Sequence, residues 1–134
     1  MAFKLINPPS LGTPKGFSNG VLTDGIGRLL FVAGQIGSDE TQSIVSENFV
    51  AQFDRALANV VAVVSEAGGR ADQIARLLIY VTDKTEYTLN LKAVGECYRA
   101  RMGRHFPAMA LLEVKGLLDD NAKVEIEAVA VLNP

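Results

Sequence analysis

The sequence contains few residues of the types that build metal centres and disulfides. It has one cysteine, Cys97, one histidine, His105, and no tryptophan in 134 residues. A single cysteine excludes an intrachain disulfide and a zinc site made of several cysteines. A single histidine argues against a metal centre built from histidines, so we expect no metal ligands in this chain.

Long apolar runs and blocks of like charge are also absent from the sequence. No segment reaches the roughly 18 apolar residues of a membrane span, and the opening MAFKLINPPS lacks the apolar core of a signal peptide. The 13 basic and 15 acidic residues are scattered and give a net charge of −2, which disfavours nucleic-acid binding. We therefore expect a cytoplasmic protein that binds neither a membrane nor a nucleic acid.

Apolar residues, by contrast, are plentiful. Hydrophobic residues make up 49% of the chain and charged residues 21%, a composition typical of an ordered globular domain. The length fits one such domain, and no repeat, linker or low-complexity tract divides it. We expect a single domain over residues 1–134.

Hydrophobic spacing predicts the element order β-β-α-β-α-β-β. Apolar residues recur every three or four positions over 46–67, which predicts a helix with Ser46 as its N-cap. The two glycines at 68–69 predict a left-handed stop for this helix. A second helix is expected over 83–102, capped by Asp83 with a reciprocal acid three residues later.

The remaining segments have the composition of strands and loops. Residues 7–20 are rich in Pro, Gly, Ser and Asn and predict an irregular loop. The segment 20–34 predicts a hairpin that turns near Asp24 and Gly25. Further strands are expected at 75–83, 108–114 and 123–132. Two helices separated by single strands predict an α+β fold, in which a mixed sheet has both helices on one face.

The last predicted strand has two faces, and both carry apolar residues. One face consists of Val124, Ile126, Ala128, Ala130 and Leu132, and the other of Glu125, Glu127, Val129 and Val131. The strand at 29–32 has no polar residue at all. Because two helices can cover only one face of the sheet, we expect a second copy of the chain to cover the other. A loop of the same chain packed over that face is the alternative.

No strong catalytic motif is present, since GxGxxG, Walker and GxSxG patterns are all missing. Cys97 and His105 are residue types that can act as nucleophile and base, but a buried thiol and a loop histidine are the simpler interpretations. Glu125 and Glu127 lie two apart on a strand, so one is a candidate acid or ligand-binding group and an intersubunit ion pair is the alternative. Three arginines gather at the end of the second predicted helix, where the helix dipole favours them and an anion site is the alternative: Arg99, Arg101 and Arg104.

Four segments together resemble the RidA/YjgF family, also labelled L-PSP endoribonuclease. They are FVAGQIG at 31–37, TDKTEY at 82–87, HFPAMALLEV at 105–114 and VEIEAVAVL at 124–132. The resemblance implies a chorismate-mutase-like α+β fold and a homotrimer with a barrel-like core and ligand clefts between subunits. It also implies hydrolysis of enamines and imines such as 2-aminoacrylate to a 2-keto acid and ammonia, without a cofactor.

The segment PAMALL departs from the family pattern PAR(S/T). The family's arginine holds the substrate carboxylate, because a guanidinium can pair with both carboxylate oxygens. Met109 stands at that position here, and a thioether cannot bind a carboxylate. Leu111 stands where the family has a hydroxyl or thiol.

Other positions that the resemblance assigns to the ligand cleft are also changed. Phe17 in GFSNGV replaces a tyrosine, and Gly95 in GECY replaces an asparagine. Glu125 is kept, as a candidate catalytic residue. Backbone amides near Gly34 and Ala110 are further expected contacts to the ligand.

These departures lead to two hypotheses about function. The first is a homotrimer that binds a small metabolite between subunits without efficient hydrolysis of 2-aminoacrylate-type imines. The alternative is an enamine or imine deaminase, or a related hydrolase, that acts on a less acidic or aromatic substrate with Glu125 activating water. RNA cleavage, which the family label also names, is disfavoured by the net charge and the lack of a basic patch.

Overall fold

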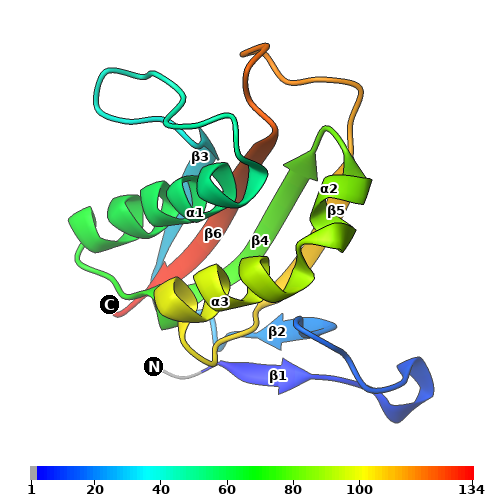
Figure 1. The fold of residues 1–134 in the computed structure, drawn as a ribbon. Coiled ribbons are helices and arrows are strands. Elements are labelled where there is room, and N and C mark those ends of the chain that lie inside the picture. The colour runs from blue at the N-terminus through cyan, green and yellow to red at the C-terminus, as the bar shows by residue number, and fades with distance from the viewer. Residues whose placement is uncertain (1–2) are drawn as a thin grey trace.

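A four-stranded mixed sheet with helices against one face forms the centre of the computed structural model, which describes residues 3–134 (Figure 1). The strand order is β3 (Arg28–Ile36), β6 (Val124–Leu132), β4 (Ile74–Val81) and β5 (Ala108–Glu113). β6 is antiparallel to both of its neighbours, whereas β4 and β5 are parallel. A parallel pair needs a long crossover, and the helical segment between β4 and β5 supplies it. The prediction of an α+β fold with helices on one face is confirmed.

Helix α1 (Phe49–Glu66) lies across the sheet and buries the predicted apolar stripe. Its N-cap is Asn48, whose side-chain oxygen accepts a hydrogen bond from the backbone N–H of Ala51 at 2.9 Å. The prediction of Ser46 as N-cap is wrong, because its hydroxyl instead accepts from the N–H of Asn48 at 3.0 Å. Gly68, with φ at +87°, ends the helix region as predicted.

The second predicted helix is in fact two helices, α2 (Lys84–Leu89) and α3 (Leu91–Met102). They meet at Asn90, which leaves helical geometry with φ −119° and ψ 23° and whose side chain donates to the carbonyl oxygen of Glu86 at 2.6 Å. This local bond competes with a continuous helix. Asp83 caps α2 as predicted. Glu86 is not its reciprocal partner and instead pairs with Lys123 at 3.3 Å.

The predicted hairpin over 20–34 does not form. β2 (Gly20–Leu22) pairs with β1 (Lys4–Ile6) in a small separate sheet, and β3 pairs with β6. The turn signal itself is correct, because Gly25 has φ at +79° and the side chain of Asp24 accepts from the N–H of Ile26. A turn fixes a change of direction, but the longer strand β6 offers β3 a larger apolar pairing surface. The predicted loop at 7–20 contains a short 3-10 turn (Pro9–Leu11).

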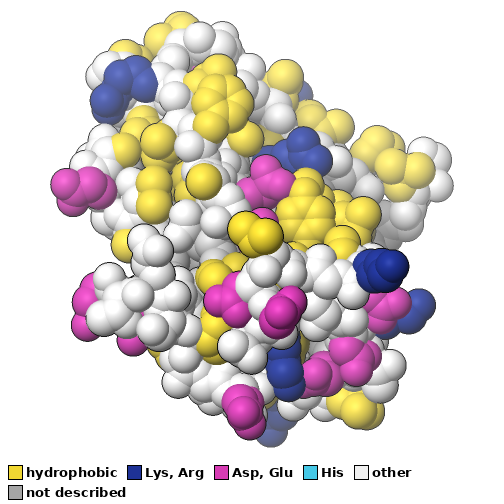
Figure 2. Space-filling model, turned by 90° about the horizontal axis from the view of Figure 1, so that it is seen from above, with side chains coloured by type: hydrophobic (Ala, Val, Ile, Leu, Met, Phe, Trp, Pro, Cys, Tyr) yellow, Lys and Arg dark blue, Asp and Glu magenta, His cyan; other side chains and the backbone are white. Residues whose placement is uncertain are grey.

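The two faces of the main sheet have different surroundings. Helices α1 and α3 cover one face, and the core lies between them and the sheet. No helix within residues 3–134 covers the other face, which we call the open face. It carries Leu29, Phe31, Leu78, Tyr80, Ala110, Leu112, Glu125, Glu127 and Val129. Leu29 is 62% exposed and Phe31 is 73% exposed. Figure 2, which views the molecule from above, shows apolar side chains at the surface among charged ones.

The helices of the described part of the chain, residues 3–134, include none that is long and apolar enough to cross a membrane.

Candidate ligand site

The predicted site residues divide between the two sides of the sheet. On β5, Met109 and Leu111 pack toward the helices, while Ala110 between them points to the open face. Glu125 lies on the open face of β6, beside Gly34 of β3. Within one chain, the structure therefore does not bring Met109 and Glu125 into one site.

On the helix side, Met109 and Gly95 line the same pocket, which has a volume of about 290 Å³. We call it the Met109 pocket. Its lining consists mainly of aromatic and aliphatic side chains: Phe53, Ile79, Tyr87, Leu91, Val94, Tyr98, Phe106 and Met109, with Gly16, Gly95 and Arg99. A largely apolar cavity with few polar groups is typical of small-molecule sites.

Gly16 lines the pocket, and Ser18, two residues later, is bonded to the segment just before β5. The hydroxyl of Ser18 donates to the carbonyl oxygen of Phe106 at 2.6 Å, and its N–H donates to that of Pro107 at 3.0 Å. Phe17, the predicted site residue, lies between Gly16 and Ser18, is 37% exposed and is not among the residues that line this pocket.

Tyr98 and His105 hold the turn between α3 and β5. The hydroxyl of Tyr98 donates to the carbonyl oxygen of His105 at 2.6 Å, and the ring of Tyr98 stacks on Phe106. Nε2 of His105 lies 2.6 Å from the carbonyl oxygen of Ile74, so this nitrogen carries the hydrogen and donates. These bonds give His105 a structural role, in agreement with the simpler interpretation of its sequence position.

The two glutamates on the open face have different partners. Glu127 accepts a hydrogen bond from the hydroxyl of Tyr80 at 2.6 Å, and this bond is the main reason that the pKa of Tyr80 is raised. Glu125 forms no hydrogen bond or ion pair with any of residues 3–134. Its carboxylate lies against Gly34 so closely that a Cβ atom at Gly34 would lie 2.8 Å from the Glu125 Cδ atom. Any side chain at position 34 would therefore displace the carboxylate of Glu125.

Cys97 has the environment of a structural thiol. It lies half-buried on α3, and burial, with the nearby carboxylate of Asp54 as a smaller cause, raises the pKa of its thiol. A raised pKa leaves little thiolate at neutral pH, so this side chain is a poor nucleophile.

The three clustered arginines also have different surroundings. Arg101 donates two hydrogen bonds of 3.1 Å to the carboxylate of Asp54, one to each oxygen. Arg99 and Arg104 form no hydrogen bond or ion pair within the described chain, residues 3–134. Arg99 lines the Met109 pocket. The sequence does not distinguish the three arginines, because their positions on the helix do not fix the directions of their side chains.

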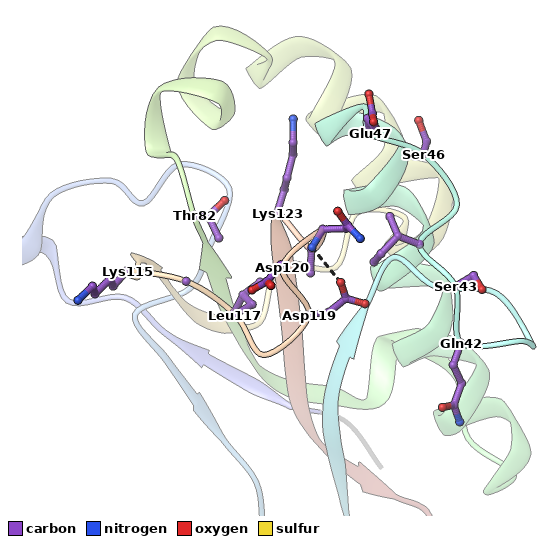
Figure 3. A pocket seen from close by; sticks show the side chains of 14 residues that line it. Gln42, Ser43, Ser46, Glu47, Thr82, Lys115, Leu117, Asp119, Asp120 and Lys123 are labelled. Carbon is purple, nitrogen blue, oxygen red and sulfur yellow. Dashed lines mark hydrogen bonds between the residues drawn. The ribbon is translucent and has the colours of Figure 1, made fainter.

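A larger and more open depression, of about 1040 Å³, lies between the segment at 42–47 and the loop at 115–123 (Figure 3). Its lining is mainly polar, and Figure 3 shows Asp119 and Asp120 between Lys115 and Ser43. Asp119 accepts from the backbone N–H of Asn121 at 2.9 Å, as in an ordinary turn. No group of carboxylate, histidine or cysteine side chains suited to a metal ion occurs in the described residues. The sequence of the loop at 115–123 therefore indicates a turn and not a ligand site.

Comparison with known proteins adds to this geometry. The family model described as Endoribonuclease L-PSP matches residues 10–132. The chain belongs to the endoribonuclease L-PSP family. The resemblance to RidA/YjgF proteins predicted from the four sequence segments is confirmed.

Several members of the family are similar to the chain over most of its length. The 2-iminobutanoate/2-iminopropanoate deaminase of Salmonella typhimurium is 33% identical over 106 residues, which are 79% of this chain and 81% of that protein. A Yersinia pestis protein of unknown function, YyfB of the conserved Rid family, has a TM-score of 0.87 at 30% identity and covers 98% of this chain and 100% of its own. The YjgF gene product of Escherichia coli has a TM-score of 0.67 at 30% identity. The match covers 93% of this chain and 92% of that one.

Proposed function

We propose that this endoribonuclease L-PSP family member is a single-domain, cytoplasmic homotrimer that binds a small metabolite in clefts between subunits. It has little of the deaminase activity for which its relatives are named. The observation that carries this proposal is Met109, which lies in the lining of an apolar pocket at the position where the family resemblance implies an arginine.

The chemistry of position 109 argues against efficient turnover of small imino acids. Their carboxylate needs a charged, bidentate partner, which a guanidinium provides and a thioether does not. Loss of such a pair lowers affinity on the order of a hundredfold. Leu111 and Phe17 add no hydroxyl group that would compensate. The same side chains favour a ligand with an apolar body.

The open face supports the homotrimer. Leu29, Phe31 and Leu112 are all exposed there in the single chain, and an apolar patch of this kind is typical of an interface. In the proposed trimer this face is buried between subunits, which brings Gly34, Ala110 and Glu125 to the clefts. Glu125 then contributes from the open face, and the Met109 pocket contributes from the helix side.

A deaminase assay tests the proposed lack of activity. The full chain and the Escherichia coli relative are compared at equal concentration on 2-iminopropanoate generated enzymatically in the cuvette, with ammonia release as the readout. We expect the chain to be at least about a hundredfold slower, in proportion to the lost charge pair. A rate within tenfold of that relative would overturn the proposal.

The second candidate function is a hydrolase that acts on a less acidic or aromatic substrate. The lone carboxylate of Glu125, seated against Gly34, favours it. A carboxylate without a hydrogen-bond partner can contact a water molecule directly, whereas that of Glu127 already accepts from Tyr80. The discriminating variant is Glu125→Gln.

A further inference from the structure

We infer that Arg99 supplies the anion-binding group of the Met109 pocket, and that this pocket takes carboxylates with an aromatic or other bulky apolar body. The inference rests on the proposed function in that it takes the Met109 pocket as the ligand site. Arg99 enters the pocket from α3 and not from β5, so a carboxylate that it binds is held elsewhere in the pocket than one bound to an arginine at position 109.

The position of the Arg99 side chain depends on Gly95. The two residues lie four apart on α3 and therefore on one face of the helix. A Cβ atom at Gly95 would lie 3.1 Å from Nη1 of Arg99, 3.7 Å from Nη2 and 3.8 Å from Cζ. The guanidinium thus lies over Gly95, in contact with the place that a Cβ atom would take. Because position 95 has no side chain, the guanidinium can lie close to the helix backbone at the edge of the pocket.

The guanidinium of Arg99 has its hydrogen-bonding capacity available. Within residues 3–134 it forms no ion pair and no hydrogen bond. Arg101, two residues later, is already held by both oxygens of Asp54. An arginine with five free donors above a cavity matches the planar, two-oxygen geometry of a carboxylate.

The rest of the pocket sets the shape and polarity of the ligand. Arg99 is the one charged residue in the described lining, so nothing there opposes an anion, although the chain as a whole is acidic. Aromatic rings from Tyr87, Tyr98 and Phe106 and the flexible side chain of Met109 form part of the remaining, apolar walls. A volume of about 290 Å³ accommodates a ring with a short carboxylate chain. Methionine adapts its shape to such a ring and makes favourable sulfur–aromatic contacts.

Binding to the full chain can be measured by calorimetry with three probes. They are 3-phenylpropanoate, its neutral amide 3-phenylpropanamide, and propanoate, which lacks the ring. We expect 3-phenylpropanoate to bind the wild-type chain about tenfold or more tightly than either of the other two, because only it satisfies both the guanidinium and the apolar walls. Equal binding of the acid and the amide, or no detectable binding of the acid, would overturn the inference.

Two variants identify the group responsible. Arg99→Gln should weaken binding of the acid about tenfold or more and leave binding of the amide unchanged. Arg104→Gln is the matched control, because Arg104 also lacks a partner within residues 3–134 but does not line the pocket. Unchanged acid binding in Arg99→Gln would overturn the inference.

These binding results are separable from the deaminase result. Binding that depends on Arg99 in a chain with full deaminase activity would overturn the proposed function alone. Binding that does not depend on Arg99 in a chain without that activity would overturn this inference alone.

Discussion

Tyr80 of β4 donates a hydrogen bond from its hydroxyl to Glu127 of β6 at 2.6 Å, across two neighbouring strands of the open face. The next acid on the same face, Glu125, has no such bond with residues 3–134. The sequence presents the two glutamates as equivalent, since both follow the same alternation. The tyrosine separates them, because the carboxylate of Glu127 is held by its hydroxyl while that of Glu125 is left available to a ligand.

This difference predicts the effect of two matched substitutions. Glu125→Gln should abolish any hydrolytic turnover that a substrate screen detects, because it removes the base but keeps the shape. Glu127→Gln should leave that turnover within about twofold, since a glutamine oxygen still accepts from Tyr80. Initial rates of ammonia release at equal protein concentration check both. An unchanged rate in Glu125→Gln would remove Glu125 from the mechanism.

The exposed phenylalanine of the open face gives a test of assembly. Phe31→Asp places a charge in the proposed interface and should convert a trimer to single chains, because an unpaired charge is costly to bury. Leu118→Asp is the control, since Leu118 is 102% exposed and lies outside the open face. Size-exclusion chromatography with light scattering measures the molar mass of the assembly. A wild-type chain that elutes as a monomer, or a Phe31→Asp variant that remains a trimer, would contradict the proposed assembly.

Gln52, a fully buried side chain, connects the two segments that flank the large depression of Figure 3. Its amide nitrogen donates to the carbonyl oxygens of Ser46 and Asn121, and its oxygen accepts from the N–H of Lys123 at 2.8 Å. Gln52→Leu leaves all three backbone groups without that partner and should lower the free energy of unfolding by about 2 kcal/mol or more.

Urea unfolding at one fixed chain concentration measures this effect, because assembly makes stability depend on concentration. Asp72→Asn is the control. It breaks the exposed pair between Asp72 and Arg70 and should change the free energy of unfolding by less than about 0.5 kcal/mol. Equal effects of the two substitutions would contradict the assigned role of Gln52.

Tyr98 predicts how stability responds to alkaline pH. Burial raises the pKa of its hydroxyl, which also donates to His105. The folded-state pKa therefore lies above the unfolded value of about 10. Stability is intact below about pH 10 and falls as the pH rises further, since the unfolded chain loses the proton first. Tyr98→Phe should lower stability by about 1 kcal/mol at neutral pH and flatten the alkaline decline.

Thermal unfolding of both proteins between pH 7 and pH 11 measures this response. Part of the decline should remain in Tyr98→Phe, because burial of Tyr87 and the bond from Tyr80 to Glu127 raise the pKa values of those hydroxyls too. Parallel curves for the two proteins above about pH 10 would contradict the assignment to Tyr98.

Errors in the predicted fold occur where a local pattern depends on a distant partner. The turn at Asp24 and Gly25 is real, yet β2 pairs with β1 and not with β3, because β3 pairs with the edge of β6. Apolar spacing runs across Asn90 without a break, but the side chain of Asn90 bonds back to Glu86 and interrupts the helix. Periodicity records which face a residue occupies, and it does not record such competing hydrogen bonds.

The sequence by itself determined the type and order of the main helices and strands, because hydrophobic periods of two and of three to four are local properties. It also determined the family resemblance and the presence of a methionine, in place of an arginine, at position 109, since both depend only on which residues occur. Only the tertiary structure decided that Glu127 is bonded while Glu125 is not, and that Arg99 lies over Gly95 in the pocket that holds Met109. Those relationships depend on the directions of side chains from elements that meet only after folding. The spacing of residues along the chain does not give these directions.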